Sequence, residues 1–188
     1  MENKKVPVLI TREPGGTAIG DKIRDVLLDP EHNKMFGKTE VLLYAAARAQ
    51  LVDEVIRPAL EAGKVVICDR YLDSSIAYQS FGLGEDPDFI RRVNEEATGE
   101  LYPDLTLVLD VESETGMARL KERLSQENTG EDRIEEKDLE YHERVRQGYL
   151  FIARLQGDRI KTIKADGDEE AVHQEIIIEA EKLLLQKE

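Results

Sequence analysis

Two residues able to handle a phosphorylated ligand, Asp69 and Arg70, directly follow a short apolar segment, Val65 to Cys68. Four apolar residues without a polar break suit a strand that is buried on both faces of a parallel sheet. Ligands bind at the carboxyl edge of such sheets. An Asp there can hold Mg²⁺ directly or through water, and an Arg can form paired hydrogen bonds with phosphate oxygens. A surface ion pair ahead of an ordinary helix is the alternative interpretation.

The next segment adds three hydrogen-bonding side chains. Ser75, Tyr78 and Gln79 stand at positions i, i+3 and i+4 of a helix expected over 73–81. This spacing puts all three on one face of the helix. The charged pair is therefore followed by a polar helical stripe.

A second strand ends in a similar way. Val6 to Thr11 is typical of a short apolar strand, and it runs into Arg12-Glu13-Pro14-Gly15-Gly16. Paired glycines between a strand and a helix allow positive φ angles and let a ligand approach the backbone closely. Pro-Gly-Gly alone also fits a plain turn. Here, however, Arg12 and Glu13 precede the turn, and Arg24 follows on a helix expected over 18–28.

A long helix expected over 39–62 carries Tyr44 and Arg48, which are four residues apart and share a face. An aromatic ring can stack on a nucleobase, and an Arg one turn later can donate to a base carbonyl. Taken alone, the two residues fit better as a buried tyrosine and a surface ion-pair partner.

The remaining pattern alternates strands with helices. Further strands are expected at 105–111 and 159–165, and further helices at 87–98, 113–125, 137–156 and 169–186. This alternation predicts an α/β fold with a parallel sheet and helices on both faces. The polar segment 125–137 is the candidate for a mobile lid, and a solvated loop between two helices is the alternative.

Composition excludes several classes of protein. The chain has 188 residues, 35% of them charged and 40% hydrophobic, which indicates a globular protein rather than a disordered one. A net charge of −14 argues against a broad nucleic-acid surface. No apolar run approaches the roughly 20 residues of a membrane span. The lone Cys68 and the lack of a secretory signal favour the cytoplasm.

These segments together resemble thymidylate kinase of the bacterial type. The matching strings are TREPGGT at 11–17, IGDKIRDVLLDP at 19–30, TEVLLYAAARAQ at 39–50, VVICDRYLDSSIAYQ at 65–79, LYPDLTLVLDV at 101–111 and DRIEEKDLEYHERVRQGY at 132–149. The resemblance implies a three-layer P-loop kinase-like fold, one nucleoside monophosphate kinase-like domain over 1–188, and a homodimer. It also implies phosphoryl transfer from ATP to dTMP, giving dTDP, with Mg²⁺ as cofactor.

The resemblance assigns roles to the residues above. Arg24 and Arg70 would bind the monophosphate of the acceptor, and Asp69 would support Mg²⁺ through water. The base would stack on Tyr44 and contact Arg48, Ser75 and Gln79, with Tyr78 and Glu13 near the sugar, Glu13 alternatively near the metal. In the lid, Arg123 and Arg133 would neutralise the donor phosphates. The nearby competitors are Arg119, Arg144 and Arg146, which fit better as members of helix-surface ion pairs.

One departure from the family pattern matters for activity. The family begins with a strand, a phosphate-binding loop of the form G-x-x-x-x-G-K-[ST] and a helix, and these 188 residues contain no such string. Residues 1–5 would correspond to the end of that helix. We therefore expect the usual first central strand to be absent and turnover by this chain to be doubtful. A downstream start site and a truncation are both possible origins. The alternative function is a catalytically inactive remnant that binds a nucleotide or a partner.

Overall fold

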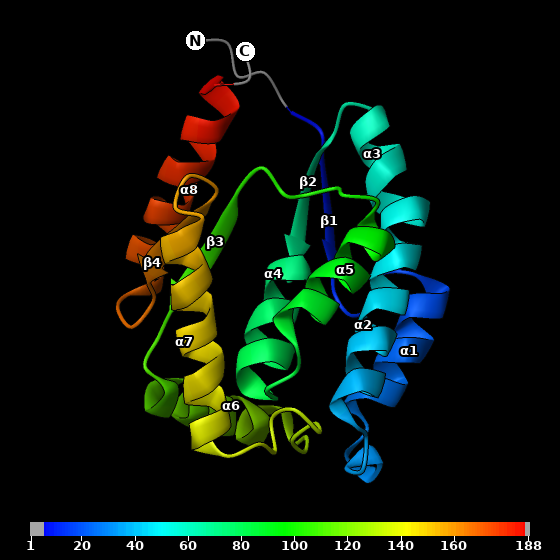
Figure 1. The fold of residues 1–188 in the computed structure, drawn as a ribbon. Helices are drawn as coiled ribbons and strands as arrows, with labels where there is room; N and C mark the ends of the chain where they lie inside the picture. The colour runs from blue at the N-terminus through cyan, green and yellow to red at the C-terminus, as the bar shows by residue number, and fades with distance from the viewer. Residues whose placement is uncertain (1–5, 187–188) are drawn as a thin grey trace.

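The computed structural model describes residues 6–186 and shows parallel strands flanked by helices (Figure 1). The strands are β1 (Val8–Arg12), β2 (Val65–Asp69), β3 (Thr106–Asp110) and β4 (Ile160–Lys164). The helices are α1 (Ala18–Leu28), α2 (Gly37–Leu51), α3 (Arg57–Glu61), α4 (Leu72–Ser75), α5 (Pro87–Thr98), α6 (Ser113–Glu127), α7 (Leu139–Leu155) and α8 (Glu169–Gln186), with short segments η1 (Pro30–His32), η2 (Val52–Ile56) and η3 (Ile76–Gly82). The expected α/β class is confirmed. The helix end expected at 1–5 lies outside the described residues.

The strands form two parallel pairs instead of one continuous sheet. β1 pairs with β2, placing Val8 beside Val65 and Arg12 beside Asp69. β3 pairs with β4, placing Thr106 beside Ile160. Within residues 6–186, no strand joins β2 to β3. The expected single sheet is thus divided between β2 and β3 within the described residues.

The predicted helices are found, but two of them change pitch. The expected helix 39–62 is α2, then the π-helical segment η2, then α3. Pro58 lies at the start of α3, and because proline has no N–H to donate, it interrupts the α-helical hydrogen-bond pattern there. The expected helix 73–81 is α4 followed by the π-helical segment η3. Wider π turns occur often at functional sites.

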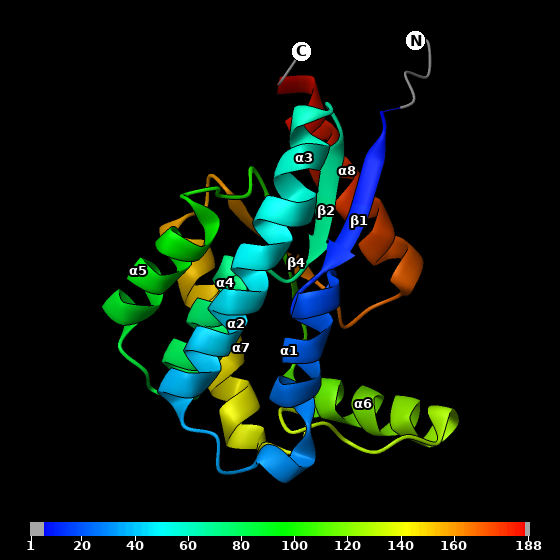
Figure 2. The same ribbon diagram turned by 90° about the vertical axis from the view of Figure 1, so that its right-hand side faces the viewer.

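The two faces of the β1–β2 pair have different surroundings. One face packs against the helical layer, where Val66 and Cys68 contact the buried cluster of Leu51, Val52 and Ile56. This layer, made of α2, η2 and α3, covers one side of the pair, whereas α8 lies on the opposite side of the molecule (Figure 2). The other face carries Val8, Ile10 and Ile67, which are all exposed.

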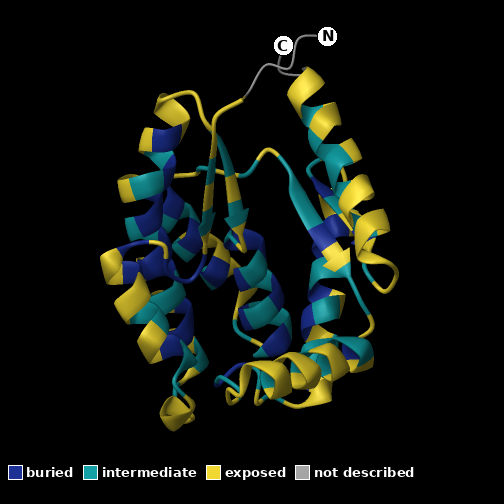
Figure 3. Cartoon of the chain, turned by 180° about the vertical axis from the view of Figure 1, so that it is seen from behind, coloured by how far each residue is buried: buried dark blue, intermediate teal, exposed yellow. Residues whose placement is uncertain are grey.

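A second layer is built from α7. It packs against η3 through Ala77, Tyr141 and Val145, and against β3 and β4 through Ile152. Gly148 permits this contact, since a Cβ atom there would lie 2.8 Å from Cγ of Phe81. Figure 3 shows buried residues on the inward sides of these helices and exposed ones on their outer sides.

Both ends of α5 carry residues typical of helix caps. Asp86 caps α5 by accepting from the backbone N–H of Asp88, and Gly99 ends it in the left-handed conformation. Among the described residues, no helix is long and apolar enough to cross a membrane.

Candidate functional site

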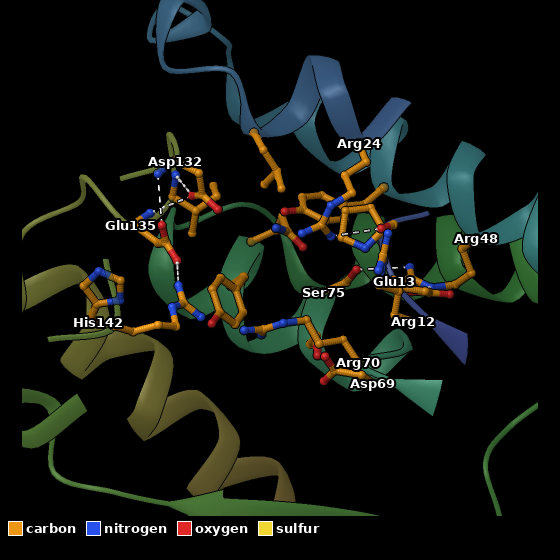
Figure 4. Close-up of a pocket in the computed structure, with 18 residues that line it drawn as sticks. Arg12, Glu13, Arg24, Arg48, Asp69, Arg70, Ser75, Asp132, Glu135 and His142 are labelled. Atoms are coloured by element: carbon orange, nitrogen blue, oxygen red, sulfur yellow. Dashed lines mark hydrogen bonds and ion pairs between the residues drawn. The ribbon is translucent and has the colours of Figure 1, made fainter. Parts of the chain in front are cut away.

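A cavity of about 270 Å³ lies at the carboxyl ends of β1 and β2. This volume is near the lower end of the range for sites that hold small molecules. Figure 4 shows Arg24, Glu13, Arg48 and Ser75 grouped on one side of the cavity and Asp132, Glu135 and His142 on the other. The lining is formed by Arg12, Glu13, Pro14, Arg24, Leu28, Tyr44, Arg48, Asp69, Arg70, Ser74, Ser75, Tyr78, Gln79, Arg123, Asp132, Ile134, Glu135 and His142.

The strand ends bring the two charged segments together. Arg12 and Asp69 are register partners, and the backbone N–H of Glu13 donates to the carbonyl of Asp69 over 2.9 Å. Arg70 has a φ of 66°, a left-handed conformation that is uncommon for a residue with a side chain. Its guanidinium lies 4.9 Å from the ring centre of Tyr78. Backbone strain of this kind clusters at functional sites.

The glycine turn after β1 has the geometry that the sequence predicted. Gly16 has a φ of 81°, and a Cβ atom there would lie 2.8 Å from Leu51 Cδ1. Thr17 then caps α1 by accepting from the backbone N–H of Gly20. The Arg24 guanidinium donates to the carbonyl of Pro14 over 3.1 Å, which holds α1 against the turn.

Arg48 is the centre of a buried polar network on the floor of the cavity. The residue is only 1% exposed. Its Nε and Nη2 contact Glu13 Oε2 at 2.8 and 2.6 Å, and its Nη1 donates to Ser75 Oγ and to Asn94 Oδ1. These four contacts leave one of the five guanidinium hydrogens for a ligand.

One carboxylate oxygen of Glu13 lacks a hydrogen-bond partner among the described residues. Its Oε1 is fully enclosed and has no hydrogen-bond partner in the described structure. Burial raises the pKa of the carboxyl group, and the Arg48 charge opposes that shift. A buried polar atom without a partner is costly, so a hydroxyl or water hydrogen would be stabilised next to it.

The expected lid is tied to the body of the molecule by two buried residues. Ile134 packs with Ala77 and Tyr141. Arg133 is 4% exposed, and it donates to the carbonyl of Leu27 and to Glu40 Oε2, each over 2.7 Å. Arg133 does not line the cavity. The structure therefore places it as an anchor of the lid, which differs from the phosphate-binding position expected for it.

The other expected lid arginine does reach the cavity. Arg123 lies near the end of α6, lines the cavity, and forms an ion pair with Glu135 at 2.6 Å. Glu135 also accepts from the backbone N–H of Asp132, and Asp132 Oδ1 accepts from the backbone N–H groups of Ile134 and Glu135. The competing arginines have other partners: Arg119 donates to Ala165, Arg144 to Gly82 and Arg146 to Asp110 and Glu112.

The sequence profile described as "Thymidylate kinase" matches residues 1–176. The chain belongs to the thymidylate kinase family. Curated relatives named thymidylate kinase are 47% identical over 178 residues in an Exiguobacterium species and 48% identical over 178 residues in Symbiobacterium thermophilum. Each alignment covers 94% of this chain, with 81% of the first relative and 79% of the second.

A solved structure supports the same family. The crystal structure of thymidylate kinase from Ehrlichia chaffeensis superposes with a TM-score of 0.70 at 32% identity. The superposition covers 90% of this chain and 78% of that chain.

The Mg²⁺ ion that the resemblance implies can be compared with the side chains that line the cavity. Asp69 offers one exposed carboxylate at the cavity. In the described part of the chain, no group of three or more His, Cys, Asp or Glu side chains could hold a metal by itself. Mg²⁺ is commonly held by one or two carboxylates together with substrate phosphates. Asp69 fits an ion of this kind, which would arrive with the nucleotide.

Some residues of the site were missed by the sequence analysis. Glu40, Asn94 and His142 were not predicted as site residues, although each contacts or lines the site. Glu40 lies one turn before Tyr44 on α2, so the helical spacing that singled out Tyr44 and Arg48 could have included it. Asn94 contacts Arg48 across 46 residues of sequence, and no periodicity predicts such a pair.

Proposed function

We propose that the cavity binds dTMP as the phosphoryl acceptor. The observation that carries the proposal is the buried network of Glu13, Arg48 and Ser75 at the end of the strands, facing a cavity with Arg24 and Arg70 on its lining. A polar floor suits a base and a sugar, and arginines suit a phosphate. The relatives' names support the identity of the nucleotide.

The acceptor phosphate would lie between Arg24 and Arg70. Both line the cavity, and Arg70 extends over Tyr78. Planar guanidinium groups can each give two parallel hydrogen bonds to phosphate oxygens. The net charge of −14 makes such a local positive region necessary for an anionic substrate.

The base would stack on Tyr44 and meet Arg48, Ser75 and Gln79, and Tyr78 and Glu13 would lie near the sugar. Burial raises the pKa of the Tyr44 hydroxyl, which further favours the neutral form of this phenol. A neutral phenol keeps the stacking surface uncharged. The unpartnered Glu13 Oε1 would accept a hydrogen from the sugar or from a bound water.

The part of the site that would bind ATP, the phosphoryl donor, has fewer suitable residues than the part proposed for dTMP. Transfer of the γ-phosphoryl group of ATP needs two anions in line, a metal ion and positive charge on the migrating group. Asp69 would hold Mg²⁺, which neutralises charge on the phosphates when bound, and Arg123 would contact the donor. The 188 residues contain no phosphate-loop string. We therefore infer that they bind dTMP but give no measurable turnover by themselves.

The second candidate is a non-catalytic nucleotide-binding or partner-binding protein. The lack of a phosphate-loop string in these 188 residues favours it.

A homodimer through the long helices is also part of the proposal. Exposed apolar side chains on and beside α2, namely Phe36 and Leu42, support such a contact.

Calorimetry tests the acceptor site directly. The 188-residue chain should bind dTMP and should prefer it to dCMP, since the base lies against buried polar groups. Equal affinity for both nucleotides, or no binding to either, would refute the acceptor assignment. Size-exclusion chromatography with light scattering at several concentrations tests the dimer.

A further inference from the structure

The buried carboxylate of Glu40 connects the lid to the base side of the cavity. Glu40 is 1% exposed. Its Oε2 accepts from Arg133 Nη2 over 2.7 Å, and its Oε1 accepts from Gln79 Nε2 over 3.0 Å. Each oxygen therefore has one donor, one from the lid and one from η3. Sequence separations of 93 and 39 residues show that the contact is formed only by the tertiary fold.

This contact determines which way the Gln79 amide points. A carboxylate oxygen can only accept, so Gln79 must turn its NH₂ group toward Glu40. In the described structure no donor contacts Gln79 Oε1, and Oε1 is not one of the enclosed atoms that lack a partner. Because Gln79 lines the cavity, the cavity receives a hydrogen-bond acceptor from it.

We propose that Glu40 is a specificity-determining positioning residue, which makes the base site select a pyrimidine with N–H at ring position 3. The inference rests on the proposed function, in which the base faces Gln79. Thymine carries a hydrogen on N3, whereas cytosine carries a lone pair there. An acceptor held toward N3 pairs with thymine and opposes cytosine, and an unpaired polar contact is a strong means of rejection.

Arg133 determines which groups donate and which accept in the hydrogen bonds from Arg133 through Glu40 to Gln79. A guanidinium has only donors, so the side chain at position 40 must present an oxygen to it. Arg133 itself is fixed, since its Nε donates to the carbonyl of Leu27 and its backbone N–H to the carbonyl of Leu28. In a Glu40→Gln variant the new amide would turn its oxygen to Arg133 and its NH₂ to Gln79. Gln79 would then have to offer its own NH₂ to the cavity.

The experiment compares base preference in matched variants by calorimetry with dTMP and dCMP. In Glu40→Gln we expect the ratio of dTMP to dCMP affinity to fall by about 10- to 10²-fold, with dCMP binding gaining in absolute terms. The double variant Glu40→Gln with Gln79→Glu should recover the preference, because a carboxylate at 79 again offers an acceptor to the cavity. A merely structural role for Glu40 would not produce a gain for dCMP or this recovery.

Asp73→Asn is the matched control. Asp73 is also buried, and it forms an ion pair with Arg159 through Oδ1 at 2.7 Å, but it does not line the cavity. The same carboxylate-to-amide change should lower the melting temperature there and leave the ratio unaltered. A folded Glu40→Gln variant with the wild-type ratio would overturn the inference. A wild-type chain without any dTMP preference would instead refute the proposed function.

A measurement on the unmodified chain covers the case in which Glu40→Gln does not fold. The NMR signals of the Gln79 side-chain amide should show a carboxylate-bound NH₂ group in the free chain and keep that signature when dTMP binds. A move of these signals to the range of solvent-exposed amides on dTMP binding would show that Nε2 leaves Glu40, and the inference would be wrong.

Discussion

Two regions of the β1–β2 pair differ in how well the described residues cover them. One is the cavity at the carboxyl ends of the strands, and the other is the outer face of the same strands. At the cavity, buried charges have partners, as in Glu13 with Arg48 and Glu40 with Arg133. On the outer face, Ile10 is 77% exposed and Ile67 is 53% exposed. The buried charges at the cavity are thus paired within the described residues, whereas the outer face offers apolar surface that proteins usually cover.

The largest expected effect is on kinase turnover, compared between the 188-residue chain and an extended version. The 188-residue chain should show no measurable formation of dTDP from dTMP and ATP. A version extended with a strand, phosphate loop and helix from a close relative should turn over at roughly 1–100 s⁻¹, as kinases do. Single electrostatic groups in such sites are often worth about 10²–10³ in rate, so the loss of a whole cradle should exceed that. Coupled detection of ADP on both versions makes the comparison.

Kinase-like turnover by the short chain would mean that its donor site uses residues not identified above. An extended chain that folds but ignores dTMP would instead refute the acceptor assignment.

The cavity floor should depend strongly on Arg48. Arg48→Ala leaves the Glu13 carboxylate buried without its partner, and breaking a buried ion pair costs about 3–5 kcal/mol in the free energy of unfolding. Urea denaturation measures the loss. Arg91→Ala is the control, because Arg91 is 55% exposed in its pair with Glu95 and should cost less than about 1 kcal/mol.

The same variant tests recognition of the base. Under conditions where Arg48→Ala stays folded, dTMP binding should weaken by about 1–3 kcal/mol, because a charge-assisted hydrogen bond is lost. Unchanged stability together with unchanged affinity for dTMP would show that Arg48 is not a residue of the binding site.

Arg70 should matter for turnover and little for folding. In the extended chain, Arg70→Lys should reduce kcat by about 10²-fold, near 3 kcal/mol, because a point charge cannot reproduce a forked contact with phosphate. Its side chain contacts the ring of Tyr78 at the cavity, so the melting temperature should change little. Normal kcat in this variant would show that the arginine has a structural role.

The smallest expected effect is a difference in unfolding free energy between substitutions on the two faces of β2. Val66→Thr should cost about 1–2 kcal/mol, because Val66 packs against the Leu51 cluster. Ile67→Thr on the outer face should cost less than about 0.5 kcal/mol in the 188-residue chain. Equal costs in urea denaturation would show that both faces are covered in solution.

The sequence predicted the strands and helices closely because their signals are local. The apolar run before Asp69 predicted β2, and the helix expected over 87–98 is α5, Pro87–Thr98. The change to π-helical pitch in η3 was not predicted, since one wider turn alters the hydrophobic spacing by a single residue.

The candidate site was predicted in part. Glu13, Arg24, Tyr44 and Arg48 do line one cavity with residues of η3, but their roles there stay proposals. The position of Arg133 could not be predicted, because its partners Leu27 and Glu40 lie 106 and 93 residues away. Polar sequence around it suggested a mobile loop, and only the tertiary fold reveals the buried acceptors that hold it.

The contact between Asp73 and Arg159 has a consequence for how the molecule unfolds. Arg159 donates two hydrogen bonds to Asp73 and one to Thr106, which ties α4 to the start of β3 and β4 across 86 residues of sequence. The two strand pairs share no hydrogen-bonded ladder in the described residues, yet this contact links α4, which follows β2, to the β3–β4 pair. Separating the two pairs would leave Asp73 and Arg159 without their ion-pair partners, and this favours one cooperative transition over two separate ones.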